Sequence, residues 1–263
     1  MAILILTSAS GSPGVTTLAV GLALTWPRSV LLADCDPGAH QAILAGYLAG
    51  QSSQGKGLLR VAEAHRDRRP LREVVIDQCL PLAGEDGDRR LFLPGFTKPG
   101  SAAHFGAVWE DLADAFDRLG DVDLDVIVDA GRVGPLGLPA PLVERSALTA
   151  LVLGSSLRAV MSARVHLPVI TEHHPALSAQ ARHPFGLVVV GEGQPYGRGE
   201  ISKALGLPVL ADVVRGDPHV AAHLSDGGTR PRRFDSSSLV RSIRGAASSL
   251  ASTLQRSTEL VRS

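Results

Sequence analysis

The stretch that decides the fold is AILILTSASGSPGVTTLAVGLAL, residues 2–24. It begins with five apolar residues, passes through a turn rich in glycine and serine, and continues into an apolar run of helix-forming residues. A strand, a glycine-rich turn and a helix in this order point backbone N–H groups and the positive end of the helix dipole at one spot. The stretch therefore predicts a phosphate site at the start of an α/β domain.

The residues of this turn suit a phosphate and a magnesium ion. Gly11 and Gly14 allow positive φ angles and a close approach of the backbone to an anion, and Thr16 offers a hydroxyl at the helix start. The standard phosphate-loop motif GxxxxGK[ST] is not matched, because Val15 stands at the lysine position. A tight turn that uses glycine only for its geometry is the alternative.

Short apolar runs alternate with amphipathic ones along the rest of the chain, the pattern of a parallel sheet covered by helices on both faces. We expect a single α/β domain with a twisted, mainly parallel sheet. The expected strands are 2–6, 30–33, 91–93, 126–128, 149–153, 186–190 and 208–210. The expected helices are 17–25, 103–119, 157–172, 200–205 and 219–224.

Three aspartates follow apolar strands. LLADCDP (31–37) places Asp34 and Asp36 at the end of the second strand, and VIVDAG (126–131) places Asp129 at the end of another. Ligands of open parallel sheets bind at the carboxyl edge, where these acids would meet the glycine-rich turn. A single aspartate at such a place is commonly a helix cap or turn residue, but three near one phosphate turn predict handling of magnesium and water.

Composition excludes several classes of protein. The chain has 263 residues, 44% of them apolar and 20% charged, which excludes disordered and fibrous proteins. Its 26 basic and 26 acidic residues balance, so whole-molecule attraction to nucleic acid or acidic membrane is not predicted. Cys35 and Cys79 lie in apolar surroundings typical of reduced thiols, and with no leader or spanning stretch they predict a cytoplasmic protein.

The C-terminal part differs in charge. Residues 229–263 hold seven arginines against two acids, a local charge of +5 that leaves −5 for the remainder. Apolar residues recur there at helical spacing. They are Leu239, Ile243, Ala246 or Ala247, Leu250, Leu254 and Val261. We expect a nucleotide-binding domain over 1–228 and a basic segment over 229–263 whose helix packs on that domain. Docking of this segment to anionic lipid, DNA or an acidic partner is the alternative. Its membrane affinity would be weak, because the helix lacks Trp and Phe.

Four segments together resemble the ParA/MinD family of deviant Walker ATPases. They are SASGSPGVTTLA (8–19), LLADCDP (31–37), DLDVIVDAG (123–131) and LGLPVLADVVRGDPHVAAHLSDG (205–227). The resemblance covers nearly the whole chain. It is closest to an actinobacterial-looking subgroup that has GxPGVTT where the better-known members have KGGVGKTT.

The resemblance implies ATP and magnesium at the first turn, and two subunits that close over the nucleotide. The residues around the phosphates would be Gly11, Ser12, Pro13, Gly14, Val15, Thr16 and Thr17. Thr16 would ligate magnesium and Asp129 would hold it through water. Asp36 would orient the attacking water with support from Asp34.

Departures from the family pattern predict slow or absent hydrolysis. Ser10 and Val15 stand where the family has lysines, and losing one such phosphate contact costs on the order of 3–5 kcal/mol in the barrier. Pro13 also removes one N–H donor, and VVVGEG (188–193) stands where relatives carry an asparagine that reads adenine. Arg132 is the expected replacement cation, with a surface or capping arginine as the alternative.

Two functions follow as hypotheses. The first is a nucleotide-binding switch that forms a nucleotide-dependent homodimer, engages a protein partner and positions a chromosome, division site, pilus or secretion apparatus, with weak membrane or DNA contact through the basic segment. The second is a pseudo-ATPase scaffold that binds no nucleotide. A metabolic enzyme on the same fold lacks a recognisable substrate site.

Overall fold

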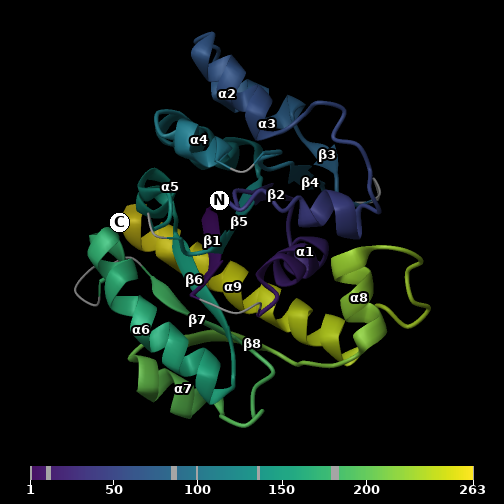
Figure 1. Cartoon of the computed structure of the whole chain (residues 1–263), viewed down its shortest axis with the longest axis vertical. Helices are drawn as coiled ribbons and strands as arrows, with labels where there is room; N and C mark the ends of the chain where they lie inside the picture. Colours follow the sequence, from purple (N-terminus) through teal and green to yellow (C-terminus); the bar gives the residue numbers. More distant parts are fainter. Residues whose placement is uncertain are drawn as a thin grey trace.

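A computed structural model describes residues 2–9, 13–83, 88–98, 100–134, 137–178 and 184–262. They form one α/β domain around an eight-stranded sheet of order β3-β4-β2-β5-β1-β6-β7-β8 (Figure 1). Every neighbouring pair is parallel except β3 and β4. The predicted fold class is confirmed.

The strands follow the apolar runs of the sequence. Their bounds are β1 Ile3–Ser8, β2 Val30–Asp34, β3 Leu80–Pro81, β4 Arg90–Leu93, β5 Asp125–Arg132, β6 Leu148–Gly154, β7 Phe185–Val190 and β8 Val209–Val213. All seven expected strands are present, although β5 is longer than predicted and β8 extends to Val213 rather than ending at 210. The sequence analysis missed β3, because a two-residue antiparallel strand has no periodicity to detect.

Nine α-helices connect the strands within the described residues. Their bounds are α1 Val15–Thr25, α2 Leu58–Arg66, α3 Leu71–Asp77, α4 Val108–Arg118, α5 Ala140–Arg145, α6 Leu157–His173, α7 Arg198–Leu205, α8 Pro218–Asp226 and α9 Ser238–Arg262. The continuous helix predicted over 103–119 is wrong: a 3₁₀ turn at Ser101–Phe105 precedes α4. The short helices α2, α3 and α5 were not predicted.

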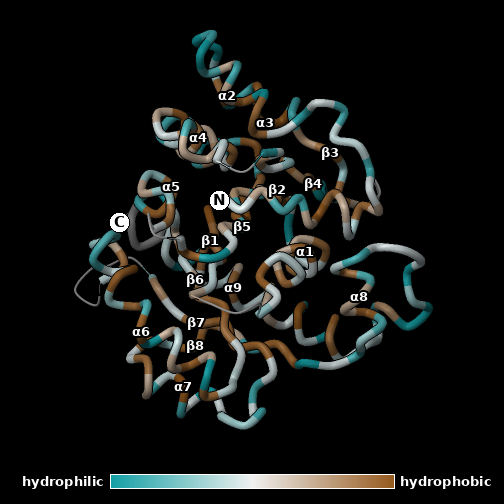
Figure 2. Tube along the Cα trace, viewed as in Figure 1, coloured by the Kyte–Doolittle hydropathy of each residue, from teal (hydrophilic) through white to brown (hydrophobic). Residues whose placement is uncertain are grey.

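Alternating side chains of the strands form two separate cores. Ile3 and Ile5 of β1 pack in one core with α3, α4 and α6, whereas Leu4 and Leu6 pack in the other with α1, α8 and α9. Figure 2 shows the hydrophobic residues concentrated along the central strands and the hydrophilic ones at the outer ends of α2 and α8. The near-continuous apolar runs are thus explained by burial on both faces.

The C-terminal helix α9 lies along α1 and β8 (Figure 1). Its apolar stripe is buried as far as Leu254, with Ile243, Leu250 and Leu254 at most 2% exposed, whereas the side chain of Val261 lies outside the described part of the chain. Gly21 of α1 permits this packing, since a Cβ there would lie 2.9 Å from Cδ1 of Ile243. The stripe therefore belongs to the domain core. No helix among the described residues is long and apolar enough to span a membrane.

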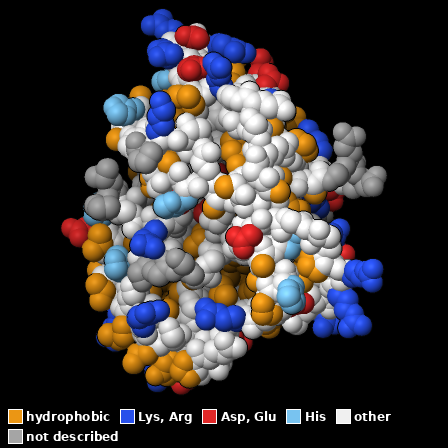
Figure 3. Space-filling model, turned by 45° about the vertical axis from the view of Figure 1, so that its right-hand side comes forward, with side chains coloured by type: hydrophobic (Ala, Val, Ile, Leu, Met, Phe, Trp, Pro, Cys, Tyr) orange, Lys and Arg blue, Asp and Glu red, His pale blue; other side chains and the backbone are white. Residues whose placement is uncertain are grey.

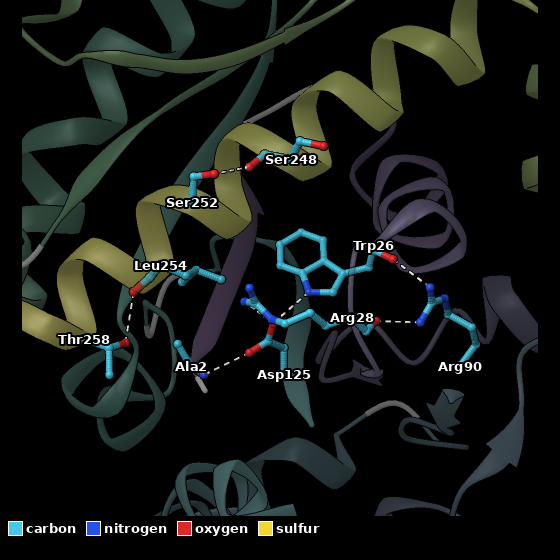
Figure 4. Close-up of polar contacts among 9 residues, drawn as sticks. All are labelled: Ala2, Trp26, Arg28, Arg90, Asp125, Ser248, Ser252, Leu254 and Thr258. Atoms are coloured by element: carbon cyan, nitrogen blue, oxygen red, sulfur yellow. Dashed lines mark hydrogen bonds and ion pairs between the residues drawn. The ribbon is translucent and has the colours of Figure 1, made fainter. Parts of the chain in front are cut away.

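A buried carboxylate joins three elements at the amino edge of the sheet. Asp125 is fully buried and accepts hydrogen bonds from Nε1 of Trp26 at 2.8 Å, from Nη2 of Arg28 at 2.6 Å and from the Ala2 N–H at 3.2 Å (Figure 4). Arg90 in turn donates to the carbonyls of Trp26 and Arg28. This network fixes the exit from α1 against β5 and β4.

We predict that Asp125→Ala lowers the free energy of unfolding by about 2–4 kcal/mol, because it leaves the buried indole N–H and the guanidinium without an acceptor. Urea denaturation measures the loss. Asp235→Ala is the matched control, since Asp235 is an exposed carboxylate paired with Arg230 at 2.8 Å, and it should cost about 1 kcal/mol or less. Equal losses for the two variants would contradict the role of Asp125.

Candidate functional site

The candidate site lies at the carboxyl ends of β2, β5 and β1, which are neighbours in the sheet. Asp34 of β2 pairs in register with Asp129 of β5, and Asp129 pairs on its other side with Leu6 of β1. The glycine-rich turn leaves β1 at this edge and leads into α1. The topology thus brings together the strand-end acids and the turn that the sequence analysis singled out.

The start of α1 has the features of an anion site. Gly14 is the N-cap residue with φ of 88°, in the left-handed region that favours glycine, and as a glycine it has no side chain to cap the helix. The first N–H groups of α1 thus receive no side-chain acceptor from their N-cap residue. Val15 is buried in the core around α1, so it presents only backbone to a ligand. Gly11, Ser12 and Ser10 lie outside the described residues; Pro13 and Thr17 are half-buried beside Gly14.

Asp129 is almost completely buried and is held by two donors. It accepts from the Gly131 N–H at 3.0 Å and from the hydroxyl of Thr16. Burial raises the pKa of Asp129 to about 6, even though these two hydrogen bonds act in the opposite direction. Thr16 and Asp129, the predicted magnesium residues, are therefore in direct contact.

Asp34 and Asp36 complete the group of acids. The Asp36 N–H donates to Oδ1 of Asp34 at 3.2 Å, and the Gly38 N–H donates to Oδ1 of Asp36 at 2.8 Å. Burial, and then the charge of Asp129, raise the pKa of Asp34 to about 8. No arginine or lysine of the described residues forms an ion pair with any of the three carboxyl groups. A cation would be stabilised here.

Two glycines allow the acids to pack this closely. A Cβ at Gly95 would lie 2.6 Å from Cγ of Asp34, and a Cβ at Gly131 would lie 2.3 Å from Cγ of Asp36. Gly131 also has φ of 60°. Gly95 was not predicted, although its position two residues after β4 was a detectable signal.

Cys35 lies between Asp34, which ends β2, and Asp36, and it is buried, as predicted. Its N–H donates to the carbonyl of Asp129 at 2.8 Å, which extends the pairing of β2 with β5. Burial and the neighbouring carboxylates raise the pKa of its thiol well above the ordinary value. Cys35 is thus a packing residue at neutral pH rather than a nucleophile.

Arg132 ends β5 opposite Ser8 of β1, and its side chain is exposed. It lies at the same edge as the three acids. Farther along the edge, the Ser155 hydroxyl bonds to the carbonyl of Gly191 and accepts from the Gln194 N–H, and the Arg215 side chain crosses Gly191. Ser155 and Arg215 were not predicted, although Ser155 directly follows β6 and Arg215 lies two residues after β8.

The loop that leaves β5 is fastened to α6. Nε2 of the buried His174 accepts a hydrogen bond from the Leu138 N–H at 3.0 Å, so this nitrogen is unprotonated. Burial, and then the neighbouring His173, lower the pKa of His174. The end of α6 is thereby connected to the segment that follows Asp129 and Arg132.

Two further observations on the described residues argue against a competing site. An open hollow of about 560 Å³ near the end of α2 is lined by His65, Arg66, Arg68, Arg69, Pro70 and Asp111, away from the strand ends. Among the described residues no group of three or more His, Cys, Asp or Glu side chains has the arrangement to hold a metal ion alone. A magnesium ion at Thr16 and Asp129 would need phosphate oxygens and water as further ligands.

Comparison with solved structures shows which fold this is. A ParA family ATPase from Chlorobium tepidum matches with a TM-score of 0.67 at 15% identity, over 94% of this chain and 98% of its own. The MinC:MinD complex of Aquifex aeolicus gives 0.70 at 15% identity, over 96% of each chain. The chain has the ParA/MinD fold. MinD from Pyrococcus horikoshii complexed with Mg-ADP gives 0.62 at 15% identity, over 95% of each chain.

No protein-family model and no curated protein sequence matches the chain.

We predict that Asp34→Asn stabilises the ligand-free protein by on the order of 5 kcal/mol at pH 8, a rise in melting temperature of roughly 10 °C or more, and by on the order of 2 kcal/mol at pH 5. Between the ordinary pKa of 3.8 and the folded value of about 8, the folded protein keeps a proton that the unfolded chain has lost. Stability therefore falls as pH rises through this window, and asparagine removes the effect.

Circular dichroism melts in EDTA at both pH values measure this difference. Asp235→Asn, at an exposed carboxylate, controls for the loss of one surface charge. A gain from Asp34→Asn that is the same at pH 5 and pH 8 would contradict the raised pKa.

Proposed function

We propose that the protein is a ParA/MinD-family nucleotide switch, of the subgroup with the GxPGVTT turn, that binds ATP and magnesium at the start of α1. One observation carries the proposal: the helix that begins after Gly14 places Thr16 against Asp129, one of three strand-end carboxyl groups that have no ion-pair partner among the described residues. A phosphate group suits the helix start, and a magnesium ion suits the carboxyl groups. The fold shared with MinD that holds Mg-ADP supports the choice of ligand.

Each residue would have a defined task. The backbone of seven consecutive residues would hold the phosphates. They are Gly11, Ser12, Pro13, Gly14, Val15, Thr16 and Thr17. The Thr16 hydroxyl would ligate magnesium directly, and Asp129 would hold it through water while accepting from Thr16. When bound, magnesium would neutralise charge on the phosphate oxygens.

Asp36 and Asp34 are proposed to handle water. The backbone N–H of Asp36 donates to the carboxyl group of Asp34, so Asp34 holds the backbone that carries the Asp36 side chain. Hydrolysis is expected to be slow or absent, because Ser10 and Val15 replace the lysines and the side chain of Val15 is buried. Arg132 is proposed to supply a replacement cation to the phosphates, from the same edge or across a dimer.

The cellular role that we propose is the positioning of another machine from the cytoplasm, through a nucleotide-dependent homodimer and a protein partner. The fold shared with the MinC:MinD complex supports a partner protein. Contact of the basic C-terminal segment with membrane or DNA would be weak, because the apolar stripe of α9 is buried and leaves only arginines to bind.

A scaffold that binds no nucleotide is the second candidate. It is favoured by the raised pKa of Asp34, since a protonated carboxyl group at neutral pH lets the acid group stay folded without a cation. The scaffold is also favoured by Val15, because its side chain packs in the core at the position where a lysine would contact phosphate.

Isothermal titration with ATP, with and without magnesium, distinguishes the nucleotide switch from the scaffold that binds no nucleotide. We expect magnesium-dependent binding that Thr16→Ala weakens at least tenfold, because Thr16 contacts both the metal position and Asp129. Thr25→Ala is the matched control: its hydroxyl caps a carbonyl at the other end of α1, and it should bind like the parent. Lack of binding at millimolar ATP would reject the switch and support the scaffold.

A further inference from the structure

Helix α6 exposes a row of hydrophobic side chains. Leu157, Met161, Val165 and Val169 are 57%, 47%, 67% and 42% exposed, at intervals of four residues. They are four of the seven large hydrophobic residues that are exposed within the described part of the chain. A surface helix ordinarily presents polar residues to water, so this row, which we call the α6 stripe, marks an interaction surface.

The stripe is not the face that holds α6 on the domain. That face consists of Val160, Ala163 and Ile170, which are buried in the core next to β6 and α7. Figure 3 shows hydrophobic side chains along the lower left edge of the molecule, where α6 and α7 lie in Figure 1, with basic side chains beside them. Two distinct apolar faces on one helix require two partners, of which the domain supplies one.

The stripe from Met161 to Val169 is symmetric about its most exposed residue, Val165, whereas Leu157 at the helix start has His173 at the equivalent position on the other side. Met161 and Val169 lie four residues on either side of Val165, and Arg158 and Glu172 lie seven residues on either side, about 10 Å along the helix. Arg158 and Glu172 are exposed and have no ion-pair partner among the described residues. Opposite charges at equal distances from the centre are what a helix needs to pair with an antiparallel copy of itself.

We propose that two copies of this chain associate through their α6 stripes, antiparallel and with a two-fold axis at Val165. Such an interface is isologous, so each pair occurs twice. Arg158 meets Glu172 of the partner subunit at both ends, and Met161 and Val169 pack between. Arg164 and His173, also on the exposed side of α6, lie at the rim, in water.

This interface is separate from the strand-end site, and it does not depend on nucleotide binding. It is linked to that site through the bond from the Leu138 N–H to His174 at the end of α6, and the start of α6 follows Ser155 at the same edge of the sheet. Association through α6 would therefore hold the helix that fastens the loop following Asp129.

A cysteine at the two-fold axis tests the geometry. In Val165→Cys the two thiols would face each other and form a disulfide when diamide takes up their two electrons and protons. Cys35 and Cys79 are buried and do not compete. We expect a covalent dimer on a non-reducing gel at micromolar protein without nucleotide, and none for Ser248→Cys on the exposed face of α9. Equal cross-linking of both variants, or none for Val165→Cys, would overturn the proposal.

Charge exchange tests the pairing. By sedimentation velocity without nucleotide, we expect the parent protein to dimerise and Arg158→Glu or Glu172→Arg to raise the dissociation constant at least tenfold, with the double variant returning to near the parent value. A parent that stays monomeric at 200 µM, or a double variant as weak as the single ones, would reject the interface. Binding of the monomer to phosphatidylglycerol vesicles that Val165→Asp abolishes would assign the stripe to lipid instead and equally reject it.

Discussion

The pairing of Asp34 with Asp129 in adjacent strands is the constraint on which the candidate site depends. Register fixes these two carboxyl groups side by side at the edge of the sheet, and burial makes their charges costly in the absence of a cation. Asp36 is attached to the same group through its N–H. The other features of the site, from the glycines that let the acids approach to the hydroxyl of Thr16, are arranged around this buried pair of carboxyl groups.

Strand β5 shows the difference between a structural acid and one available to a ligand. Asp125 and Asp129 lie four residues apart on one strand, and both are buried. Asp125 is satisfied by an indole, a guanidinium and a backbone N–H at the amino edge. Within the described residues, Asp129 has a hydroxyl and one backbone N–H as donors at the carboxyl edge. Asp125 therefore belongs to a complete hydrogen-bond network, whereas Asp129 has capacity for a cation.

The sequence was sufficient to predict much of the sheet and to place the strand-end aspartates at one edge of it. Continuous apolar runs located seven strands, and the glycine-rich turn and strand-end aspartates located the edge, because local patterns carry that information. Asp125 could not be recognised as a structural acid, since its partners Trp26 and Arg28 lie about a hundred residues away. Gly95 packs against Asp34 only through the pairing of β4 with β2. The α6 stripe was also missed, because periodicity shows an apolar face without showing whether it is covered.

Thermal unfolding with magnesium and ATP, separately and together, tests the central claim most directly. If the paired acids and the start of α1 form one site for a magnesium nucleotide, both ligands together at about a hundred times their dissociation constant should stabilise the fold by about 2.7 kcal/mol. That corresponds to a rise of about 5–10 °C, larger than the sum of the separate effects and lost in Asp129→Asn. An unchanged melting temperature at millimolar magnesium and ATP would contradict the account.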